Sequence, residues 1–383
     1  MNTDIPTKKP LGILFANLKG NIGDFAILEA MVDLLIAAYP GREIVVHPHP
    51  LVPVDKERLA EFLRQNPAIS ISAPTYSGGT TRVQDIFSSL LLKRGSQAFR
   101  IRSFVKHSTE HFAPFSKYEA VFMAGGDQWS GRELGVAMFG TLTAIHRLNT
   151  PVFSFPFSLK SSLFGLYSKK DLNGYFDKLS APIIVRDSLS KGIIDAFSDR
   201  PTLGADCVYS LNRKASAIAP AAHRNPERTL YVVKAQEKDL ATNLEKLVLT
   251  TDNLELFTTC PPEDSKTYRR LAESFGLPYH EPGSWQEIIA EFKACKLIVT
   301  NRLHGLILGS LAETPLLPVT TRKKSLAFAR DANIPHSAAT VADITPALIE
   351  NARKDHRLIL ENMNRYADEC RSKPHSPATP NQR

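Results

Sequence analysis

The segment Asn301–Gly305, with the sequence NRLHG, carries the two side chains whose types and spacing best suit chemistry. Apolar runs at 296–300 and 305–314 flank it and predict a strand followed by a helix. Arg302 would then stand at the carboxyl end of a strand, where its guanidinium offers paired donors to a phosphate or carboxylate. His304 can take up or release a proton near neutral pH. We expect this segment to bind an anion and move a proton; the alternative is a structural histidine.

A glycine-containing loop, Asn17–Asp24, lies between an apolar run at 11–16 and an apolar helical pattern at 25–39. Its two glycines permit tight turns and close approach of a ligand to the backbone. The start of the following helix offers N–H groups and a positive dipole end, which favour an anion. Asp24 either caps this helix or contacts a ligand, and the two roles are compatible. The loop has neither the GxGxxG spacing of dinucleotide sites nor the GK[ST] of a P-loop.

The sequence AGGDQW follows a strand expected at 118–124. Its glycine pair would let backbone amides face a cleft. Asp127 and Gln128 can bind sugar hydroxyls, and Trp129 can stack on a sugar ring. The alternative is a turn that ends in a core tryptophan.

Arg186 ends the apolar run at 182–186 and occupies a position comparable to that of Arg302. It can serve as a second cation for an anionic ligand. Alternatively, it forms an ion pair with Asp187 or remains a surface charge on a helix.

Residues 93–106 carry five positive and no negative side chains, interleaved with apolar ones. Such a segment can lie on an anionic membrane surface. The reading that we favour is an ordinary solvated helix face.

The elements that position these loops alternate between strand and helix, which predicts an α/β fold with parallel sheets. In the first half, strands are expected at 11–16, 42–48, 69–72, 118–124 and 151–156, and further helices at 54–65, 84–106, 132–147 and 188–197. After 228 the alternation restarts, with strands at 229–235, 254–259, 296–300 and 315–319 and helices at 237–249, 264–275, 285–294 and 305–314.

This pattern predicts two Rossmann-like lobes that face a central cleft, where ligands of such sheets bind. The first lobe would span 1–210 and the second 229–345, joined by a small, basic, proline-containing linker at 211–228. A closing helix is expected at 346–370, and a disordered polar tail at 371–383.

Composition excludes several classes. The chain has 383 residues, a net charge of +8 and a pI near 9.2, without a nucleic-acid-binding motif. No apolar run is long enough to span a bilayer, and the amino-terminal residues do not resemble a signal peptide, so we expect a cytoplasmic protein. The four cysteines are widely separated, which argues against structural zinc and disulfides.

These motifs, in this order, resemble the polysaccharide pyruvyl transferase family. The matching elements are Asn21-Ile-Gly-Asp24, GGDQW, Arg186-Asp-Ser-Leu-Ser190, RLHG and the SLAF that follows Lys324. The resemblance spans roughly residues 11–332. The sequence departs from the family near 152–160, where FSFPFSLKS replaces a stretch similar to Gly-Gln-Ser-Ile-Gly-Pro.

The resemblance implies a fold similar to GT-B glycosyltransferases, phosphoenolpyruvate as donor, and a sugar diol of a polysaccharide precursor as acceptor. The product would be a pyruvate ketal, formed without a cofactor or metal. The resemblance and the residue types together assign donor binding to Arg302, Arg186, Lys324 and His304, and catalysis to His304 and Asp24. They assign the acceptor to Asn17, Asn21, Gly23, Asp24, Gly125, Gly126, Asp127, Gln128 and Trp129. If the acceptor is lipid-linked, segment 93–106 would contact the inner membrane surface.

Two other functions compete with this one. A GT-B glycosyltransferase would use a nucleotide sugar and would want an acidic residue for the ribose in the second lobe. A non-catalytic sugar- or phosphate-binding relative would not need the proton carrier His304.

Overall fold

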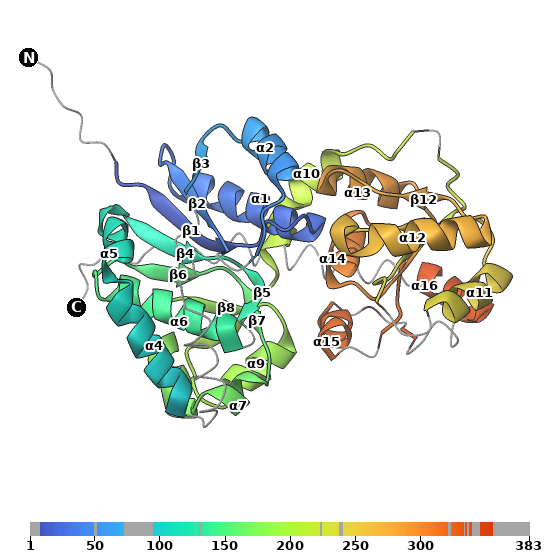
Figure 1. Cartoon of the computed structure of the whole chain (residues 1–383). Coiled ribbons are helices and arrows are strands. Elements are labelled where there is room, and N and C mark those ends of the chain that lie inside the picture. Colours follow the sequence, from blue (N-terminus) through green and yellow to red (C-terminus); the bar gives the residue numbers. More distant parts are fainter. Residues whose placement is uncertain are drawn as a thin grey trace, which may run out of the picture.

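The computed structural model describes residues 8–49, 52–72, 95–129, 132–222, 224–236, 240–320, 323–332, 334, 337–338 and 345–354. Its amino-terminal and carboxyl-terminal halves lie side by side (Figure 1). Strands from residues 11 to 203 form two parallel sheets, and strands from 229 to 318 form a third.

The first sheet is built from short apolar strands that are covered by helices. Its strand order is β3 (Ile69–Ile71), β2 (Ile44–Pro48), β1 (Leu11–Ala16), β4 (Ala120–Met123) and β6 (Val152–Ser154). Helix α1 (Ile22–Ala38) connects β1 to β2, and α2 (Lys56–Gln65) connects β2 to β3. All described pairings are parallel, which places the loops after the strands at one edge of the sheet.

The second sheet continues beyond the ends of β4 and β6. It contains β5 (Gly126–Trp129), β7 (Phe157–Leu159), β8 (Ile183–Val185) and β9 (Pro201–Leu203). Gly126 has a φ of 104°, a backbone conformation that favours glycine, and Pro156 separates β6 from β7. The strands predicted at 118–124 and 151–156 are present, but the sequence reasoning did not predict that the chain would bend and form further strands.

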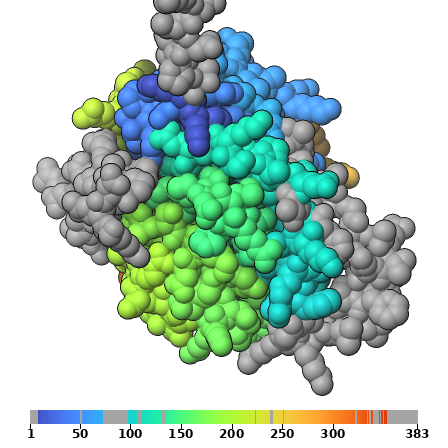
Figure 2. Space-filling model, turned by 90° about the vertical axis from the view of Figure 1, so that its left-hand side faces the viewer, coloured from blue at the N-terminus to red at the C-terminus, as the bar shows by residue number. Residues whose placement is uncertain are grey.

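The helices of this half surround both sheets. They are α4 (Gly95–His107), α5 (Thr109–Phe112), η1 (Ala113–Lys117), α6 (Arg132–His146), α7 (Leu163–Leu166), α8 (Lys169–Phe176) and α9 (Ser188–Ile194). The face in Figure 2 is formed by this half of the chain, whose blue-to-green segments cover most of the view. Part of the helix predicted at 84–106 lies outside the described residues.

The carboxyl-terminal half has one parallel sheet with the order β12 (Tyr279–His280), β11 (Leu254–Phe257), β10 (Thr229–Val232), β13 (Leu297–Thr300) and β14 (Leu316–Pro318). Its helices are α11 (Leu240–Thr250), α12 (Pro261–Phe275), α13 (Trp285–Lys293), α14 (Leu303–Leu311), α15 (Lys323–Asp331) and α16 (Pro346–Lys354). The rest of the predicted closing helix and the whole predicted tail lie outside the described residues.

The segment predicted as a linker begins with helical structure. Residues 207–217 form η2 (Cys207–Leu211) and α10 (Asn212–Ala217). Lys214 forms ion pairs with Glu29 and Asp33 of α1. From α13, Lys293 donates to the carbonyl oxygens of Ala215 and Ile218. This connection is therefore packed against elements of both halves.

Helix α1 lies at the junction of the halves. Asn21 caps it through a hydrogen bond from the Gly23 N–H. Most of its side chains are buried, and they belong to one hydrophobic cluster with residues of α13 and α14. Glu29 accepts hydrogen bonds from the Trp285 indole at 2.7 Å and from the Gln286 amide at 3.4 Å. Helix α1 has apolar side chains on most of its faces, and these side chains must be buried. Both halves therefore pack against α1.

Every helix within the described residues is too short or too polar to cross a bilayer.

Candidate active site

The loops at the carboxyl ends of strands from both halves meet in the cleft between them. They bring together seven ionisable side chains, which we call the cleft cluster: Asp24, Asp127, Arg186, Asp206, Arg302, His304 and Lys324. Four belong to the amino-terminal half and three to the other. All but Asp206 were predicted from the sequence as site residues.

Asp24 is held by the loop that precedes it. The side-chain amides of Asn17 and Asn21 donate to its Oδ2 atom at 2.7 and 3.1 Å. Burial raises the pKa of Asp24 to about 7, and the nearby carboxylates of Asp127 and Glu263 add to this effect against the charge of Arg186. A carboxyl group with such a pKa can exchange a proton near neutral pH.

Gly23 is the point where the first loop touches the carboxyl-terminal half. A Cβ atom at this position would lie 2.1 Å from both Cγ and Nδ1 of His304. Only a residue without a side chain permits this approach. The first turn of α1 is thus pressed against the imidazole that follows β13.

The two helix starts in the cleft differ in their free N–H groups. At α1, the Ile22 N–H donates across the cleft to the Thr259 carbonyl at 3.2 Å, and the Gly23 N–H is taken by Asn21. The expectation that α1 offers free amides to an anion is therefore wrong for this arrangement. At α14, among the hydrogen bonds of the described residues, the N–H groups of Leu303, His304 and Gly305 have no acceptor. The anion-attracting helix start is that of α14.

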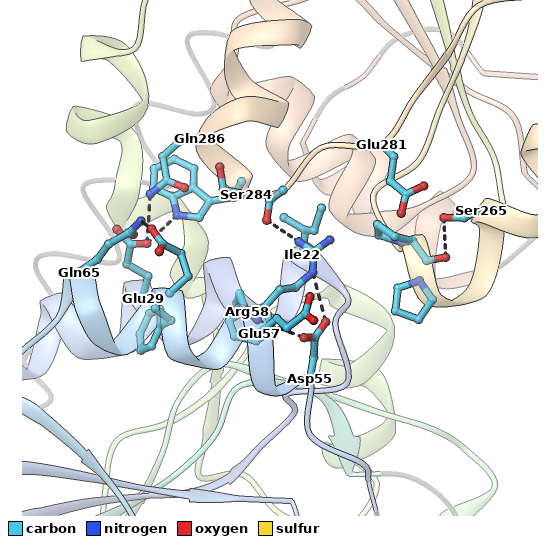
Figure 3. A pocket seen from close by; sticks show the side chains of 17 residues that line it. Ile22, Glu29, Asp55, Glu57, Arg58, Gln65, Ser265, Glu281, Ser284 and Gln286 are labelled. Carbon is cyan, nitrogen blue, oxygen red and sulfur yellow. Dashed lines mark hydrogen bonds and ion pairs between the residues drawn. The ribbon is translucent and has the colours of Figure 1, made fainter.

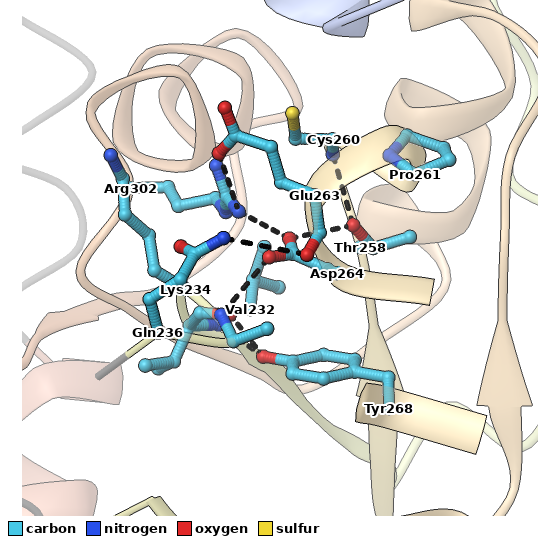
Figure 4. Close-up of polar contacts among 12 residues, drawn as sticks. Val232, Lys234, Gln236, Thr258, Cys260, Pro261, Glu263, Asp264, Tyr268 and Arg302 are labelled. Carbon is cyan, nitrogen blue, oxygen red and sulfur yellow. Dashed lines mark hydrogen bonds and ion pairs between the residues drawn. The ribbon is translucent and has the colours of Figure 1, made fainter. Parts of the chain in front are cut away.

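Arg302 is buried and oriented by an acidic pair at the start of α12. One of its terminal nitrogens bonds Asp264, and the same nitrogen lies 3.8 Å from Glu263 (Figure 4). Asp264 is fully buried, and it also accepts from the Thr258 hydroxyl at 2.9 Å and the Ala235 N–H at 3.0 Å. Asp264 therefore ties the ends of three neighbouring strands to the guanidinium. Arg302 Nε is buried without a hydrogen-bond partner in the described part of the chain.

Arg186 is equally buried, and its ion-pair partner is Asp206. Its Nε donates to the Ser158 hydroxyl at 2.8 Å, and that hydroxyl donates to Asp187 at 2.6 Å. The sequence analysis allowed a direct ion pair between Arg186 and Asp187. In the structure the Ser158 hydroxyl lies between the two side chains and bonds both. Asp187 instead caps α9 by accepting from the Ser190 N–H.

Lys324 bridges the two halves by pairing with Asp127. Burial and the charge of Arg186 lower the pKa of Lys324 to about 8, against the opposing effect of Asp127. Burial raises the pKa of Asp127, but the charges of Lys324, Arg186 and Lys160 outweigh it and leave that pKa below its usual value. The pair is consequently ionised at neutral pH.

His304 stands among these charges. Burial lowers its pKa to about 4; the charges of Arg186, Lys324 and Arg302 add to this, and Asp206 opposes it. Its Nε2 atom is buried without a partner among the described residues. In this arrangement the imidazole is neutral at pH 7, and it would hold a proton only if a nearby negative charge raised its pKa.

Three of the residues predicted to bind the acceptor do not offer the groups we expected. Trp129 is 2% exposed and packs against Phe139, Phe157 and Phe176, so the prediction that it stacks on a sugar is wrong. The N–H groups of Gly125 and Gly126 face Met31 Sδ and the Pro156 carbonyl instead of the cleft. The alternating pattern of β5 turns the indole into the core, and the glycines serve the bend before it. The Gln128 side chain lies outside the described parts.

The space beside Arg186 and Lys324 is small. A cavity of about 10 Å³, lined also by Asp187, Asp206 and Leu303, has roughly the volume of one water molecule. This space does not admit a ligand of several atoms in the present arrangement, although the Asp127 side chain of the cluster is 46% exposed to solvent.

The basic segment at 93–106 lies mostly in α4. Ile101 and Val105 are buried in the core, against which α4 packs beside α6, so much of its apolar face is already covered. Phe99, which is 70% exposed, lies on the outer face with Arg102 and Lys106. Contact of this segment with a membrane stays a prediction.

Sequence reasoning missed Asp206, Glu263 and Asp264, because each stands in no motif and acquires its role only from a distant partner. The one local signal was that Glu263 and Asp264 occupy the first turn of α12, where acidic residues are usual in any helix. Within the described residues there is no group of three or more side chains suited to hold a metal ion.

Comparison with solved structures bears on the fold. A UDP-N-acetylglucosamine 2-epimerase from Neisseria meningitidis, bound to UDP-N-acetylglucosamine, is 12% identical with a TM-score of 0.54, covering 96% of this chain and 95% of its own. The corresponding enzyme from Methanocaldococcus jannaschii is 9% identical with a TM-score of 0.52, covering 96% of each chain. The glycosyltransferase SnogD from Streptomyces nogalater is 13% identical with a TM-score of 0.51, covering 95% of this chain and 96% of its own. These likenesses confirm the two-lobed GT-B architecture.

Comparison by sequence bears on the family. No curated protein matches the chain significantly. The family described as polysaccharide pyruvyl transferase matches residues 21–322, a range that contains Asp24 at one end, RLHG near the other, and both sheets of the amino-terminal half in large part. The chain therefore belongs to the polysaccharide pyruvyl transferase family.

Proposed function

We propose that this protein transfers the pyruvyl group of phosphoenolpyruvate to two hydroxyls of a sugar in a polysaccharide precursor. The single observation that supports this best is the convergence of Arg186, Arg302 and Lys324 around His304, at the open start of α14. Family membership supplies the reaction class.

The donor would use the cations of both halves. Phosphoenolpyruvate carries a phosphate and a carboxylate, and guanidinium groups match both by paired hydrogen bonds. Arg302 Nε and the free N–H groups of α14 are donors that have no partner in the described residues. Arg186 from the amino-terminal half and Lys324 from α15 line the small cavity beside Leu303, at the start of α14.

The reaction demands two proton transfers. The methylene carbon of the donor takes up a proton, which leaves an oxocarbenium-like centre at the neighbouring carbon. One sugar hydroxyl attacks this centre, and a second then displaces phosphate and closes the ketal. Of the two hydroxyl protons, one balances the proton on the new methyl group and the other leaves with phosphate.

His304 and Asp24 suit these transfers. A bound phosphate beside His304 would raise the pKa of the imidazole, because an adjacent negative charge favours its protonated form. His304 would thus become the acid only when the donor is present. Asp24, with a pKa of about 7, would accept a proton from the acceptor hydroxyl.

Donor binding must disturb the closed arrangement. Lys324 pairs with Asp127 and Arg302 with Asp264, so the donor competes with carboxylates for both cations. Its volume exceeds that of the small cavity, and the halves would separate to admit it. Closure after binding would then return Gly23 to His304 and exclude water from the site.

Isothermal titration with phosphoenolpyruvate tests the donor. We expect saturable binding that Arg302→Ala weakens at least about tenfold, because truncation removes paired charge-assisted hydrogen bonds. Arg64→Ala is the matched control, since Arg64 is exposed on α2 and, among the described residues, its guanidinium bonds Glu61 alone. A sugar-dependent release of phosphate would then follow the reaction itself.

If the folded protein binds no phosphoenolpyruvate, with or without added oligosaccharides, the proposal fails. Saturable binding of a uridine or guanosine diphosphate sugar in that case would favour the glycosyltransferase function. Donor binding without turnover on any sugar diol would favour a non-catalytic relative.

A further inference from the structure

A second, larger cavity lies between the two halves outside the cleft cluster. Its volume is about 560 Å³, which lies in the range of small-molecule sites. It is bounded by α1 and α2 on one side and by the starts of α12 and α13 on the other (Figure 3). None of the seven side chains of the cleft cluster lines it.

The charged groups of this cavity disfavour an anionic ligand. Among the described residues, one cation, Arg58, lines it together with five carboxylates: Glu29, Asp55, Glu57, Glu61 and Glu281. Three of these carboxylates also pair with a cation outside the lining, namely Lys214, Arg64 and Arg269. Arg58 is already bound by Asp55 and by the carbonyl oxygens of Pro282 and Gly283. Glu57 has no hydrogen bond or ion pair with any described residue. A phosphate, a nucleotide or phosphoenolpyruvate would meet like charges here, which is costly in a partly enclosed space.

The same lining suits a sugar that carries no acid group. Carboxylate oxygens accept hydrogen bonds from hydroxyl or amine donors. Phe25, Phe62 and Pro262 add apolar surface to the same cavity, which can cover the C–H faces of a sugar ring. A disaccharide is a ligand of the size class that such a volume admits.

The cavity adjoins the candidate active site on both of its sides. Ile22 lines it, and the next two residues are Gly23, which contacts His304, and Asp24. Pro261 lines it from the other half, one helical turn before Asp264. The cavity and the cleft cluster are thus separated by the first turn of α1 and its contacts with Thr259 and His304.

We propose that this cavity binds the sugar units of the acceptor that neighbour the one receiving pyruvate, and that these units are uncharged or carry amines. The inference rests on the proposed function for the identity of the acceptor, but the cavity and its charge do not depend on it. It assigns recognition of an extended glycan to residues of α2 and α12 that no sequence motif marks.

Binding of disaccharides in the absence of phosphoenolpyruvate tests the inference. The probes are lactose, maltose, N,N′-diacetylchitobiose and its de-N-acetylated form, with UDP-N-acetylglucosamine as the anionic comparison, all measured by saturation-transfer NMR and titration. We expect one or more disaccharides to bind, and Glu57→Lys to weaken that binding at least about fivefold, most for the amine-bearing sugar. Glu273→Lys is the matched control, because Glu273 is an exposed acid on α12 that forms no ion pair with a described residue and does not line the cavity.

Two results would overturn the inference: no binding of any probe disaccharide, or equal binding by the Glu57→Lys and Glu273→Lys variants. The inference would also fail if UDP-N-acetylglucosamine bound more tightly than the disaccharides and Glu57→Lys strengthened that binding, because the cavity would then prefer an anion. Failure of the proposed function looks different, since disaccharides would then bind while phosphoenolpyruvate does not.

Discussion

His304 gains its properties from what surrounds it. Burial and three cations lower the pKa of its imidazole and keep it neutral, and the first turn of α1 packs against the Cγ and Nδ1 atoms of the ring. We expect the imidazole of His304 to become protonated only when an anionic ligand binds beside it. It also explains how a buried ring nitrogen can remain without a partner in the closed arrangement.

Replacing His304 by alanine should lower turnover at least about 100-fold, the lower range for loss of a general acid or base. The dissociation constant of phosphoenolpyruvate should change by less than about threefold, because the arginines remain. Phosphate release at saturating donor and titration calorimetry provide the two readouts. Unchanged turnover would remove His304 from the catalytic role.

Asp264 and Arg302 form a buried ion pair, and its contribution to the free energy of unfolding depends on the presence of both partners. Removing one partner of such a pair leaves an uncompensated charge and costs about 3–5 kcal/mol, whereas removing both costs much less. We therefore expect Asp264→Asn and Arg302→Met each to lower the free energy of unfolding of the wild type. Adding the second substitution to either single variant should lower it by much less. Urea unfolding of the four proteins measures this coupling. Strict additivity would show that Asp264 does not hold Arg302.

Among the elements, α1 and α14 face each other through their first turns. The first N–H groups of α1 have acceptors in Thr259 and Asn21, while the first N–H groups of α14 stay open among the described residues. The difference supports the proposal that the anion binds at α14, whereas α1 makes contact between the halves. Both helices follow strands of parallel sheets, so their starts must lie at the edges that line the cleft.

Gly23→Ala tests this contact between elements. The added methyl group cannot coexist with the His304 ring at 2.1 Å, so the halves should fail to close and kcat/KM should fall at least about tenfold. Gly174→Ala in α8 is the control, because nothing lies within 4 Å of its added Cβ atom. That control should keep full activity and gain up to about 1 kcal/mol of stability. Full activity of Gly23→Ala would contradict the closed arrangement.

On the scale of the molecule, buried neutral histidines make folding sensitive to acid. Burial lowers the pKa of both His47 and His49 from 6.5 to about 4. His47 is 3% exposed, and its Nε2 lies 3.0 Å from the Tyr118 hydroxyl. The unfolded chain takes up these protons below pH 6.5, whereas the folded chain does so only near pH 4.

Stability should therefore fall as the pH drops from 6.5 toward 4. For His47 alone the loss between pH 7 and pH 5 amounts to about 2 kcal/mol. Asp24 acts in the opposite direction, since its raised pKa stabilises the fold at lower pH. Comparison of wild type with His47→Gln by urea unfolding at both pH values isolates the histidine. An equal loss of stability in both proteins would refute its role.

Local sequence determined many of the elements and the two most informative site residues. Apolar periodicity placed α1 and the step from β13 to α14 close to their observed bounds, because helices and strands obey short-range spacing rules. Arg302 and His304 then had to stand at the end of a parallel strand. The family resemblance rested on the same short motifs, and the family match over 21–322 confirms it.

Only the tertiary structure decided which partners these residues meet. Arg302 pairs with a residue 38 positions away and Lys324 with one 197 positions away, and no local pattern encodes such distances. Trp129 and the glycine pair carried the right residue types for a sugar site, yet a bend between two sheets turned them into the core. The acidic cavity likewise exists only where two halves meet. Side-chain identity sets the chemistry that is available, and long-range packing decides which groups come close enough to use it.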